Sequence, residues 1–449
     1  MRRFIPLGLL GLMSVIALVH TPSAPVVVGG PINPADVAWM LTATALVLLM
    51  TPGLSFFYGG MVQRKNVIST MLQSLMAMVI ITLLWVFVGF SLAFGDSLGG
   101  IIGNPFTYFM FDRVGVATHP DLAPTIPLVL FALFHLKFAI ITPALITGSF
   151  AERVRFWSYV LFICLFTLFI YCPIAHWTWH PDGFLRRWGV LDFAGGTVVH
   201  MSAGFAALAG ALVLGRRKIH EVSGTHAPAN IPFVMLGTGM LWFGWFGFNA
   251  GSALAASGQA ALAFATTNTA SAAAALAWIS FDVLRGRKAS ALGACMGAVV
   301  GLVAITPAAG YVTVGASVVI GTLASIVSNA VVHWTSRSSL DDTLDVFPCH
   351  GVGGMVGMLL TGVFAQDVGL VHGSARTFGV QALALVIVSI FAFVGCYVLY
   401  RITNAIIPLR VSEQQELLGL DITQHDETVS SRGVRAATED LQGTLFDKA

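Results

Sequence analysis

Charged side chains are scarce in this sequence. Lys, Arg, Asp and Glu together make up 10% of its 449 residues, whereas an ordinary soluble domain contains roughly 25%. A protein whose main solvent is water is therefore excluded. The few charges gather in short clusters between apolar stretches of about 20 residues, a length that crosses the hydrocarbon core of a bilayer as a helix. The sequence predicts an all-α polytopic membrane protein.

The sequence also lacks the marks of a nucleic-acid-binding, metal-binding or disulfide-stapled protein. Its net charge is only +2, and no basic stripe exists beyond the short loops, so nucleic acid is not expected as a partner. The HExxH pattern of zinc enzymes is absent. Five cysteines without paired spacing are interpreted as small apolar packing residues: Cys164, Cys172, Cys295, Cys349 and Cys396. No cofactor, metal or enzymatic activity is predicted.

Residues 1–24 predict a secretory signal peptide. A basic start is followed by the apolar run Ile5–Val19 and by the small residues Ser23 and Ala24, the order of features that signal peptidase substrates show. Pro25 disfavours cleavage directly after Ala24. An uncleaved additional helix is therefore the alternative interpretation.

Eleven apolar windows are long enough to span a membrane: 36–62, 68–95, 125–150, 157–179, 192–215, 231–255, 259–284, 289–309, 313–335, 346–364 and 377–403. Basic residues fall in alternate loops, which the positive-inside rule assigns to the cytoplasm. The mature N-terminus is thus predicted outside and the C-terminus inside, in the inner or plasma membrane. The membrane domain is predicted over 25–404, and the polar, acidic residues 405–449 predict a cytoplasmic tail, disordered from about Ser430.

A weak internal echo predicts two inverted halves. AIITPAL at Ala139–Leu145 resembles AITPAAG at Ala304–Gly310, five windows later. The fifth window begins at Asp192, the tenth directly follows Asp345, and each contains a histidine. A repeat of five spans inserts its second copy upside down, and such folds place their site near mid-membrane between the halves. The sequence thus predicts two inverted five-helix repeats plus a final, eleventh helix.

Two histidines stand inside these windows, His200 in the fifth and His350 in the tenth. His200 follows Asp192 by eight residues, about 12 Å of helix, which places it near the middle of a ~30 Å hydrocarbon core. An ionisable group at that depth marks a substrate or proton path by default, and a hydrogen bond that braces two helices is the alternative. Asp345 precedes His350 by only about 7.5 Å of helix, so the tenth helix is expected to start recessed from the inner interface.

Paired imidazoles suit a pore. Two neutral rings that share one hydrogen bond can donate and accept along an apolar tube, and without a third ligand they are not expected to bind a metal. Aromatic residues toward the outer ends of the windows can hold a cation over their ring faces, a contact worth roughly 0.5–2 kcal/mol: Phe134, Phe138, Trp179, Trp245 and Phe248. Each is also compatible with an ordinary interface or core aromatic.

Five long motifs carry a resemblance to a known family. They are FFYGGMVQRKN at Phe56–Asn66, FAIITPALITGSFAERVRF at Phe138–Phe156, LDFAGGTVVHMSAG at Leu191–Gly204, LWFGWFGFNAGSA at Leu241–Ala253 and DVFPCHGVGGMVG at Asp345–Gly357. In this order, the motifs are similar to those of ammonium transporters of the Amt/Mep/Rh family, over nearly the whole chain from Pro34 to His425. The resemblance implies homotrimers with one pore per subunit, eleven helices in inverted halves and, in bacterial members, closure by a PII-type signalling protein on the cytoplasmic face.

The resemblance also implies individual roles. His200 and His350 match the twin pore histidines of the family, and Phe138 and Phe248 match the stacked phenyl gate above them. The outer vestibule that recruits ammonium is matched by four residues: Trp179, Phe134, Ser252 and Asp192, the last as the acidic residue that orders the vestibule and favours the cation.

This sequence departs from the family pattern at three positions. The family usually has Gln where this chain has His135, and an uncharged residue where it has Lys137. Lys137 is turned about 100° around the helix from Phe138, so it is expected to snorkel or pair elsewhere instead of entering the vestibule. In the tail, Asp426 stands where Gly is usual, which makes PII regulation a less secure expectation than transport.

The predicted function is transport of ammonium, recruited as a cation, deprotonated near the phenyl gate and passed along the imidazoles as ammonia. Three alternatives are kept. An ammonium sensor would report through the tail, which contains no evident signalling domain. A Rh-like channel for a neutral gas is disfavoured by the intact Trp179 and Ser252 vestibule. A metal-dependent membrane enzyme is disfavoured by the missing third ligand.

Overall fold

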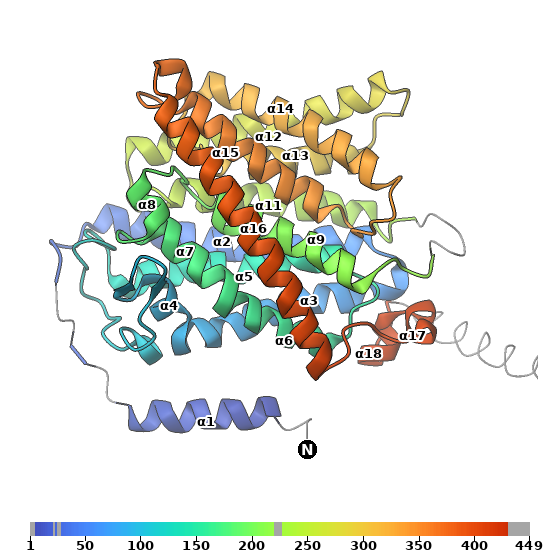
Figure 1. The fold of residues 1–449 in the computed structure, drawn as a ribbon, viewed down its shortest axis with the longest axis horizontal. Coiled ribbons are helices and arrows are strands. Elements are labelled where there is room, and N and C mark those ends of the chain that lie inside the picture. Colours follow the sequence, from blue (N-terminus) through green and yellow to red (C-terminus); the bar gives the residue numbers. More distant parts are fainter. Residues whose placement is uncertain (1–4, 21–22, 25–27, 220–226, 430–449) are drawn as a thin grey trace, which may run out of the picture.

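The computed structural model describes residues 5–20, 23–24, 28–219 and 227–429 of the chain. Nearly all of them are helical, and the long helices lie side by side in one bundle (Figure 1). The predicted disorder beyond Ser430 falls outside the described residues.

The first half of the bundle contains five spanning units. These are α2 (Pro34–Met61); α3 (Val67–Leu84) continued by the π-helix η3 (Trp85–Gly89) and α4 (Phe90–Phe94); α5 (Leu128–Phe150); α6 (Phe156–Phe166) continued by η5 (Thr167–Tyr171) and α7 (Cys172–Trp179); and the π-helix η6 (Gly196–Met201) continued by α9 (Ser202–Leu214).

The second half also contains five spanning units, and a final helix follows it. Its units are α11 (Ile231–Gly251), α12 (Gly258–Leu284), α13 (Ala291–Ile305), α14 (Val314–Thr335) and the π-helix η7 (Phe347–Val352) continued by α15 (Gly353–Phe364), before the 32-residue α16 (Ala375–Ile406). In Figure 1, α16 crosses the bundle diagonally from one end to the other.

Shorter elements cover the ends of the bundle. They are α1 (Ile5–Val19), η2 (Arg64–Asn66), the antiparallel pair β1 (Ser97–Leu98) and β2 (Ile102–Gly103), η4 (Phe109–Phe111), α8 (Phe184–Trp188), η8 (Leu370–His372), α17 (Glu413–Leu418) and α18 (Leu420–His425). Figure 1 shows α1 apart from the bundle, and α17 and α18 at the end opposite to α8.

Every predicted window contains a helix. Among the described residues, ten helical segments are long and apolar enough to cross a membrane. The eighth window, 289–309, holds α13, a shorter apolar helix of 15 residues. The windows therefore located the helices, and the eighth one overestimated helix length because the apolar run continues through turns after Ile305.

The first helices of the two halves begin in the same way and pack together. The Asn33 side chain accepts a hydrogen bond from the Ala35 N–H at the start of α2, with Pro34 in the first turn. Asn230 accepts one from Phe233 at the start of α11, also with a proline in the first turn. Asn caps and first-turn prolines are favoured starts because they satisfy or remove orphan N–H groups.

Close packing between the halves depends on small residues. A Cβ atom on Gly204 in α9 would lie 2.2 Å from the backbone nitrogen of Gly351 in η7. The two histidine-bearing segments can therefore touch backbone to backbone, as small residues allow in membrane helices.

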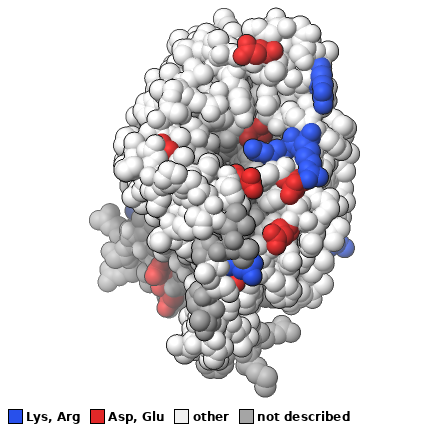
Figure 2. Space-filling view, turned by 90° about the vertical axis from the view of Figure 1, so that its left-hand side faces the viewer, with Lys and Arg blue, Asp and Glu red and all other residues white. Residues whose placement is uncertain are grey.

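The face of the molecule that lies at the left of Figure 1 carries few charged side chains. Figure 2 shows this face mostly uncharged, with scattered acidic and basic groups. Arg187 in α8 forms an ion pair with Asp182 there.

Candidate functional site

The two histidines predicted from sequence meet in the interior. Nδ1 of His200 in η6 lies 3.3 Å from Nδ1 of His350 in η7, and the ring planes are 26° apart. Both residues are buried, with exposed fractions of 1% and 4%. The expectation that pseudo-symmetry brings them together is met, and one ring must donate while the other accepts.

A third side chain decides which ring donates. The Thr306 hydroxyl donates to the carbonyl of Leu302 at 2.8 Å and accepts from Nε1 of Trp245 at 3.0 Å. With its only proton used, that hydroxyl acts as acceptor toward Nε2 of His200 at 3.3 Å. His200 then carries its proton on Nε2, so its Nδ1 accepts from Nδ1 of His350.

One side of the pair opens onto a small cavity. It is lined by His350 and by seven other residues: Phe57, Tyr58, Met61, Met296, Val299, Leu344 and Cys349. With its Nδ1 donating to His200, His350 keeps an acceptor lone pair on Nε2. The pair therefore offers hydrogen-bonding groups inside an otherwise apolar passage.

A stacked pair of phenyl rings lies directly above the histidines. The ring centroids of Phe138 in α5 and Phe248 in α11 are 4.1 Å apart at 26°, and the Phe248 centroid is 6.0 Å from that of His200. Both side chains are fully buried. The passage is thus closed by aromatic rings in this structure, and a solute that reaches the imidazoles must displace them.

Three of the predicted recruitment residues lie beside this ring pair. Trp179 at the end of α7 meets Phe138 edge to face at 5.7 Å, and Phe134 meets Phe138 at 4.9 Å. Phe134 also lies against α11, since a Cβ on Gly251 would be 2.9 Å from its ring. Ser252 follows Gly251 at the end of α11, and its hydroxyl donates to the Phe248 carbonyl at 2.8 Å. The structure therefore brings Trp179 and Phe134 together with Phe138 in one aromatic layer, and Ser252 lies at the adjoining end of α11.

Asp192 organises the start of the fifth span instead of facing the passage. Its carboxylate accepts the N–H groups of Gly195, Gly196 and Thr197 at 2.8, 2.6 and 2.7 Å, and also the Thr197 hydroxyl at 2.5 Å. Its backbone carbonyl accepts Nε1 of Trp179 at 3.2 Å. Gly195 has φ 116°, a conformation that favours glycine. Asp192 therefore holds Trp179 and the start of η6 in one arrangement.

The prediction that Asp345 is the counterpart of Asp192 is wrong. Asp342 has this role, because its carboxylate accepts the N–H of Phe347, five residues on, at 2.6 Å. It stands eight residues before His350, the same separation as Asp192 and His200. Asp345 lies in the turn before the helix, with φ 56°. The helix η6 begins four residues before His200, and η7 begins three residues before His350. Both helices therefore start recessed, and not the tenth alone.

A buried ionic network lies at the end of the bundle where the tail docks. Arg217 binds Glu152 at 2.7 Å and Asp341 at 2.9 Å, and all three side chains are at most 5% exposed. Arg153 is fully buried and donates to the backbone carbonyl of Asp341 at 2.6 Å and to Thr343 Oγ1 at 2.6 Å. Paired in this way, buried charges are tolerated; unpaired they are costly.

Three aspartates at this end differ in their pKa. Burial opposes ionisation of Asp341, but hydrogen bonds from Arg217 and the charges of Arg153 and Arg217 hold its pKa below the usual range. Burial raises the pKa of Asp342 to about 6. Burial and the adjacent Asp342 charge raise the pKa of Asp345. The same loop therefore combines one permanently ionised carboxylate with two that take up protons more readily.

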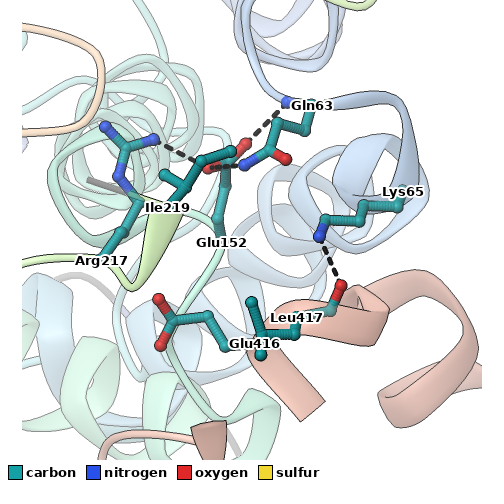
Figure 3. Close-up of a pocket in the computed structure, with 7 residues that line it drawn as sticks. All are labelled: Gln63, Lys65, Glu152, Arg217, Ile219, Glu416 and Leu417. Atoms are coloured by element: carbon teal, nitrogen blue, oxygen red, sulfur yellow. Dashed lines mark hydrogen bonds and ion pairs between the residues drawn. The ribbon is translucent and has the colours of Figure 1, made fainter. Parts of the chain in front are cut away.

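The tail closes over this network beside a cavity of about 210 Å³. Figure 3 shows Gln63 and Arg217 both reaching Glu152, and Lys65 donating to the carbonyl of Leu417 in α17. Further along the tail, Asp421 in α18 accepts the backbone N–H of Ser69 at 2.8 Å and thereby caps the start of α3. The tail is thus tied to the membrane domain by specific polar contacts.

Comparison with known proteins decides the family. A model of the Ammonium Transporter Family matches residues 38–430. The chain belongs to the ammonium transporter family. A putative ammonium transporter of Methanothermobacter thermautotrophicus is 45% identical over 407 residues, 88% of this chain and 98% of the relative.

Solved structures of the family have the same fold. The crystal structure of Saccharomyces cerevisiae Mep2 has a TM-score of 0.81 at 34% identity, covering 86% of this chain and 89% of Mep2. A structure titled Sensor Amt Protein has a TM-score of 0.80 at 30% identity, covering 87% of this chain and 98% of its own. The predicted resemblance and the polytopic helical fold class are confirmed, and the family and its relatives are transporters and not enzymes.

Sequence reasoning missed two residues near the histidines and misplaced a third. Asp342 could have been found, because its spacing to His350 repeats that of Asp192 to His200. Thr306 also had a signal, since it stands in the repeated Ile-Thr-Pro of the internal echo. Trp245 was expected toward the outer end, but its ring stacks on His200 at 5.4 Å. Nothing in the sequence indicated that contact.

Proposed function

We propose that this chain transports ammonium across the cell membrane and that the pore carries neutral ammonia past the histidines. The observation that carries the proposal is the enclosed pair His200 and His350, with Nδ1 atoms 3.3 Å apart directly below a stacked phenyl pair. Such a pair supplies donors and acceptors to a small polar solute without supplying charge.

The physical reason for deprotonation is the cost of desolvation. An unpaired cation in an apolar interior costs far more than a neutral amine of the same size. Ammonium escapes this cost by giving a proton to water on the outer side of Phe138 and Phe248. Potassium has no proton to lose, so the same passage refuses it.

The outer layer recruits the cation before the proton leaves. The ring faces of Trp179 and Phe134 attract a cation by roughly 0.5–2 kcal/mol each, and Ser252 adds a hydroxyl at the end of α11. Asp192 favours the cation through its charge and keeps Trp179 in place by the hydrogen bond at its carbonyl. Phe138 and Phe248 act as the gate between this layer and the histidines.

The resemblance of the chain to ammonium transporters supports a homotrimer in the inner or plasma membrane, with one pore per subunit. Alternating basic loops support an outside N-terminus and a cytoplasmic C-terminus, and the basic, apolar start of the chain supports a cleaved signal peptide over residues 1–24. On this orientation the docked α17 and α18 face the cytoplasm, where a PII-type protein is the proposed partner.

A second candidate function is ammonium sensing. One specific observation favours it: the chain is similar to a structure titled Sensor Amt Protein. In this chain the tail contacts the start of α3 through Asp421, so a change in the membrane domain can reach the tail. Deleting 411–449 and measuring flux and cellular ammonium signalling separately distinguishes the two functions. A Rh-like channel for a neutral gas differs from both, because its flux does not depend on recruiting a charged solute.

The transport proposal is tested in proteoliposomes. We expect uptake with ammonium and methylammonium gradients and none with potassium. His200→Ala removes the hydrogen bond to His350 and is expected to lower ammonium flux and selectivity. His119→Ala is the matched control, because it removes a histidine from an outer loop instead of the pore. The proposal fails if potassium passes as readily as ammonium, or if His200→Ala leaves both flux and selectivity unchanged.

A further inference from the structure

His135 lies at the centre of the outer aromatic layer. In the sequence, this position stands out only because the family usually has Gln there. It lies in α5, three residues before Phe138, and its ring contacts five aromatic rings. Their centroids lie 4.4 to 5.9 Å from that of His135: Phe131, Phe94, Trp179, Phe134 and Phe138. Three of these five rings belong to the proposed recruitment layer and gate.

One nitrogen of this imidazole is buried and has nothing to bind. Among the described residues, Nδ1 of His135 has no hydrogen-bond partner, and the residue as a whole is 8% exposed. A buried polar atom without a partner is unfavourable and uncommon. A hydrogen-bond donor that enters this layer can satisfy that nitrogen.

We propose that His135 is a further binding contact for the ammonium cation, with Nδ1 accepting one of its N–H groups on the outer side of Phe138. The inference rests on the proposed transport function and adds a residue to its recruitment layer. Ring faces attract a cation without fixing its orientation, whereas an imidazole lone pair accepts one N–H in a defined direction.

The groups beside His135 differ in what they can still accept. Both carboxylate oxygens of Asp192 are taken by backbone N–H groups and by the Thr197 hydroxyl. The Ser252 hydroxyl donates its proton to the Phe248 carbonyl and keeps lone pairs that can accept a second N–H of the ammonium, whereas Trp179 offers only a donor, which Asp192 already accepts. His135 is the side chain in contact with the Trp179 and Phe138 rings that has a free nitrogen.

The contact distinguishes ammonium from potassium in a way that ring faces do not. Potassium has no N–H group, so it loses the hydrogen bond and keeps only the attraction to the rings. Methylammonium keeps three N–H groups and remains a ligand. The contact also requires a neutral imidazole, because a protonated ring has no lone pair and repels the cation.

Other titratable groups surround this layer. Those on α5 itself and on the segments packed against it are Lys137, Asp96, His176, His180, Arg186 and Asp192. Several of them already have partners: His176 lies within hydrogen-bond distance of Ser97 and of the Ala93 carbonyl. All of them remain in a variant that changes His135 alone, so a comparison with wild type isolates the imidazole.

Two substitutions separate the hydrogen bond from packing. His135→Leu keeps an apolar side chain of similar size and removes the acceptor, whereas His135→Gln keeps an acceptor that does not titrate. The measurement is methylammonium uptake by proteoliposomes of each full-length protein, fitted for KM and maximal rate. We expect KM of His135→Leu to rise about ten- to a hundredfold, the range for hydrogen bonds to charged groups, with the maximal rate within about twofold, and His135→Gln to stay near wild type at neutral pH.

The two variants together decide the outcome. Equal KM for His135→Leu and wild type at neutral pH overturns the proposal, as does a KM of His135→Gln that rises as far as that of His135→Leu. Failure of the transport function itself looks different, because wild type would then show no ammonium-specific uptake at any pH.

Discussion

Gly204→Ala tests whether the close approach of the two halves is what holds the histidines together. The added Cβ would lie 2.2 Å from the nitrogen and 2.3 Å from the Cα of Gly351, and both are backbone atoms that cannot rotate away. Because real Cβ contacts essentially never fall under 3.0 Å, η7 and the start of α9 must separate by roughly 1 Å. His350 is the residue before Gly351, so it moves with that backbone.

The magnitude follows from the same geometry. The Nδ1 atoms of His200 and His350 are 3.3 Å apart, so a further separation of roughly 1 Å breaks their hydrogen bond. We expect a loss of about 1–3 kcal/mol in unfolding free energy, as for other overpacked cores, and a fall in ammonium transport of about tenfold or more, since 1.4 kcal/mol in a barrier is tenfold in rate.

The assay pairs thermal unfolding of the purified protein with methylammonium uptake in proteoliposomes. Gly239→Ala in α11 is the matched control, because a Cβ there meets nothing within 4 Å and a helical Gly→Ala change stabilises by roughly 0.5–1 kcal/mol. If Gly204→Ala unfolds and transports like wild type, the backbone contact does not hold the histidine pair and the reasoning is refuted.

Two further predictions concern the end of the bundle where the tail docks. Arg217→Met leaves the buried carboxylates of Glu152 and Asp341 without their shared cation, and we expect a loss of about 3–5 kcal/mol, visible as a lower unfolding midpoint; an unchanged midpoint would contradict this. Burial raises the pKa of Asp342 to about 6, above the ~3.9 of an unfolded chain, so the folded state binds more protons between these values and loses stability as pH rises through them. Asp342→Asn should flatten this dependence of the unfolding midpoint between about pH 4 and pH 6, and an equal slope in both proteins would exclude Asp342 as its source.

Much of the architecture follows from transfer energetics along the chain. Few charges and eleven apolar windows predict the spanning helices, because the cost of placing a residue in hydrocarbon is a property of that residue. The eighth window shows the limit of this reasoning. Its hydropathy continues beyond Ile305, but α13 ends there, since hydropathy does not report where backbone hydrogen bonds stop.

The candidate site was only partly predictable. His200 and His350 were identified by their place inside apolar windows, and the resemblance added Phe138 and Phe248. The choice of Asp345 as the counterpart of Asp192 failed because sequence position was taken for helix position. The turn at Asp345 has a left-handed backbone, and Asp342 reaches past it to the first N–H group of η7.

The sequence by itself determined that the protein lies in a bilayer, where its spans lie, to which family it belongs and which two histidines lie inside the spans. These properties depend on residue types and their spacing. Only the tertiary structure decided that Thr306 directs the protons of the histidine pair, that Trp245 stacks on His200 and that His135 keeps an unpartnered nitrogen among five rings. Those contacts join residues far apart in the chain and depend on distances of a few tenths of an ångström, which side-chain packing alone sets.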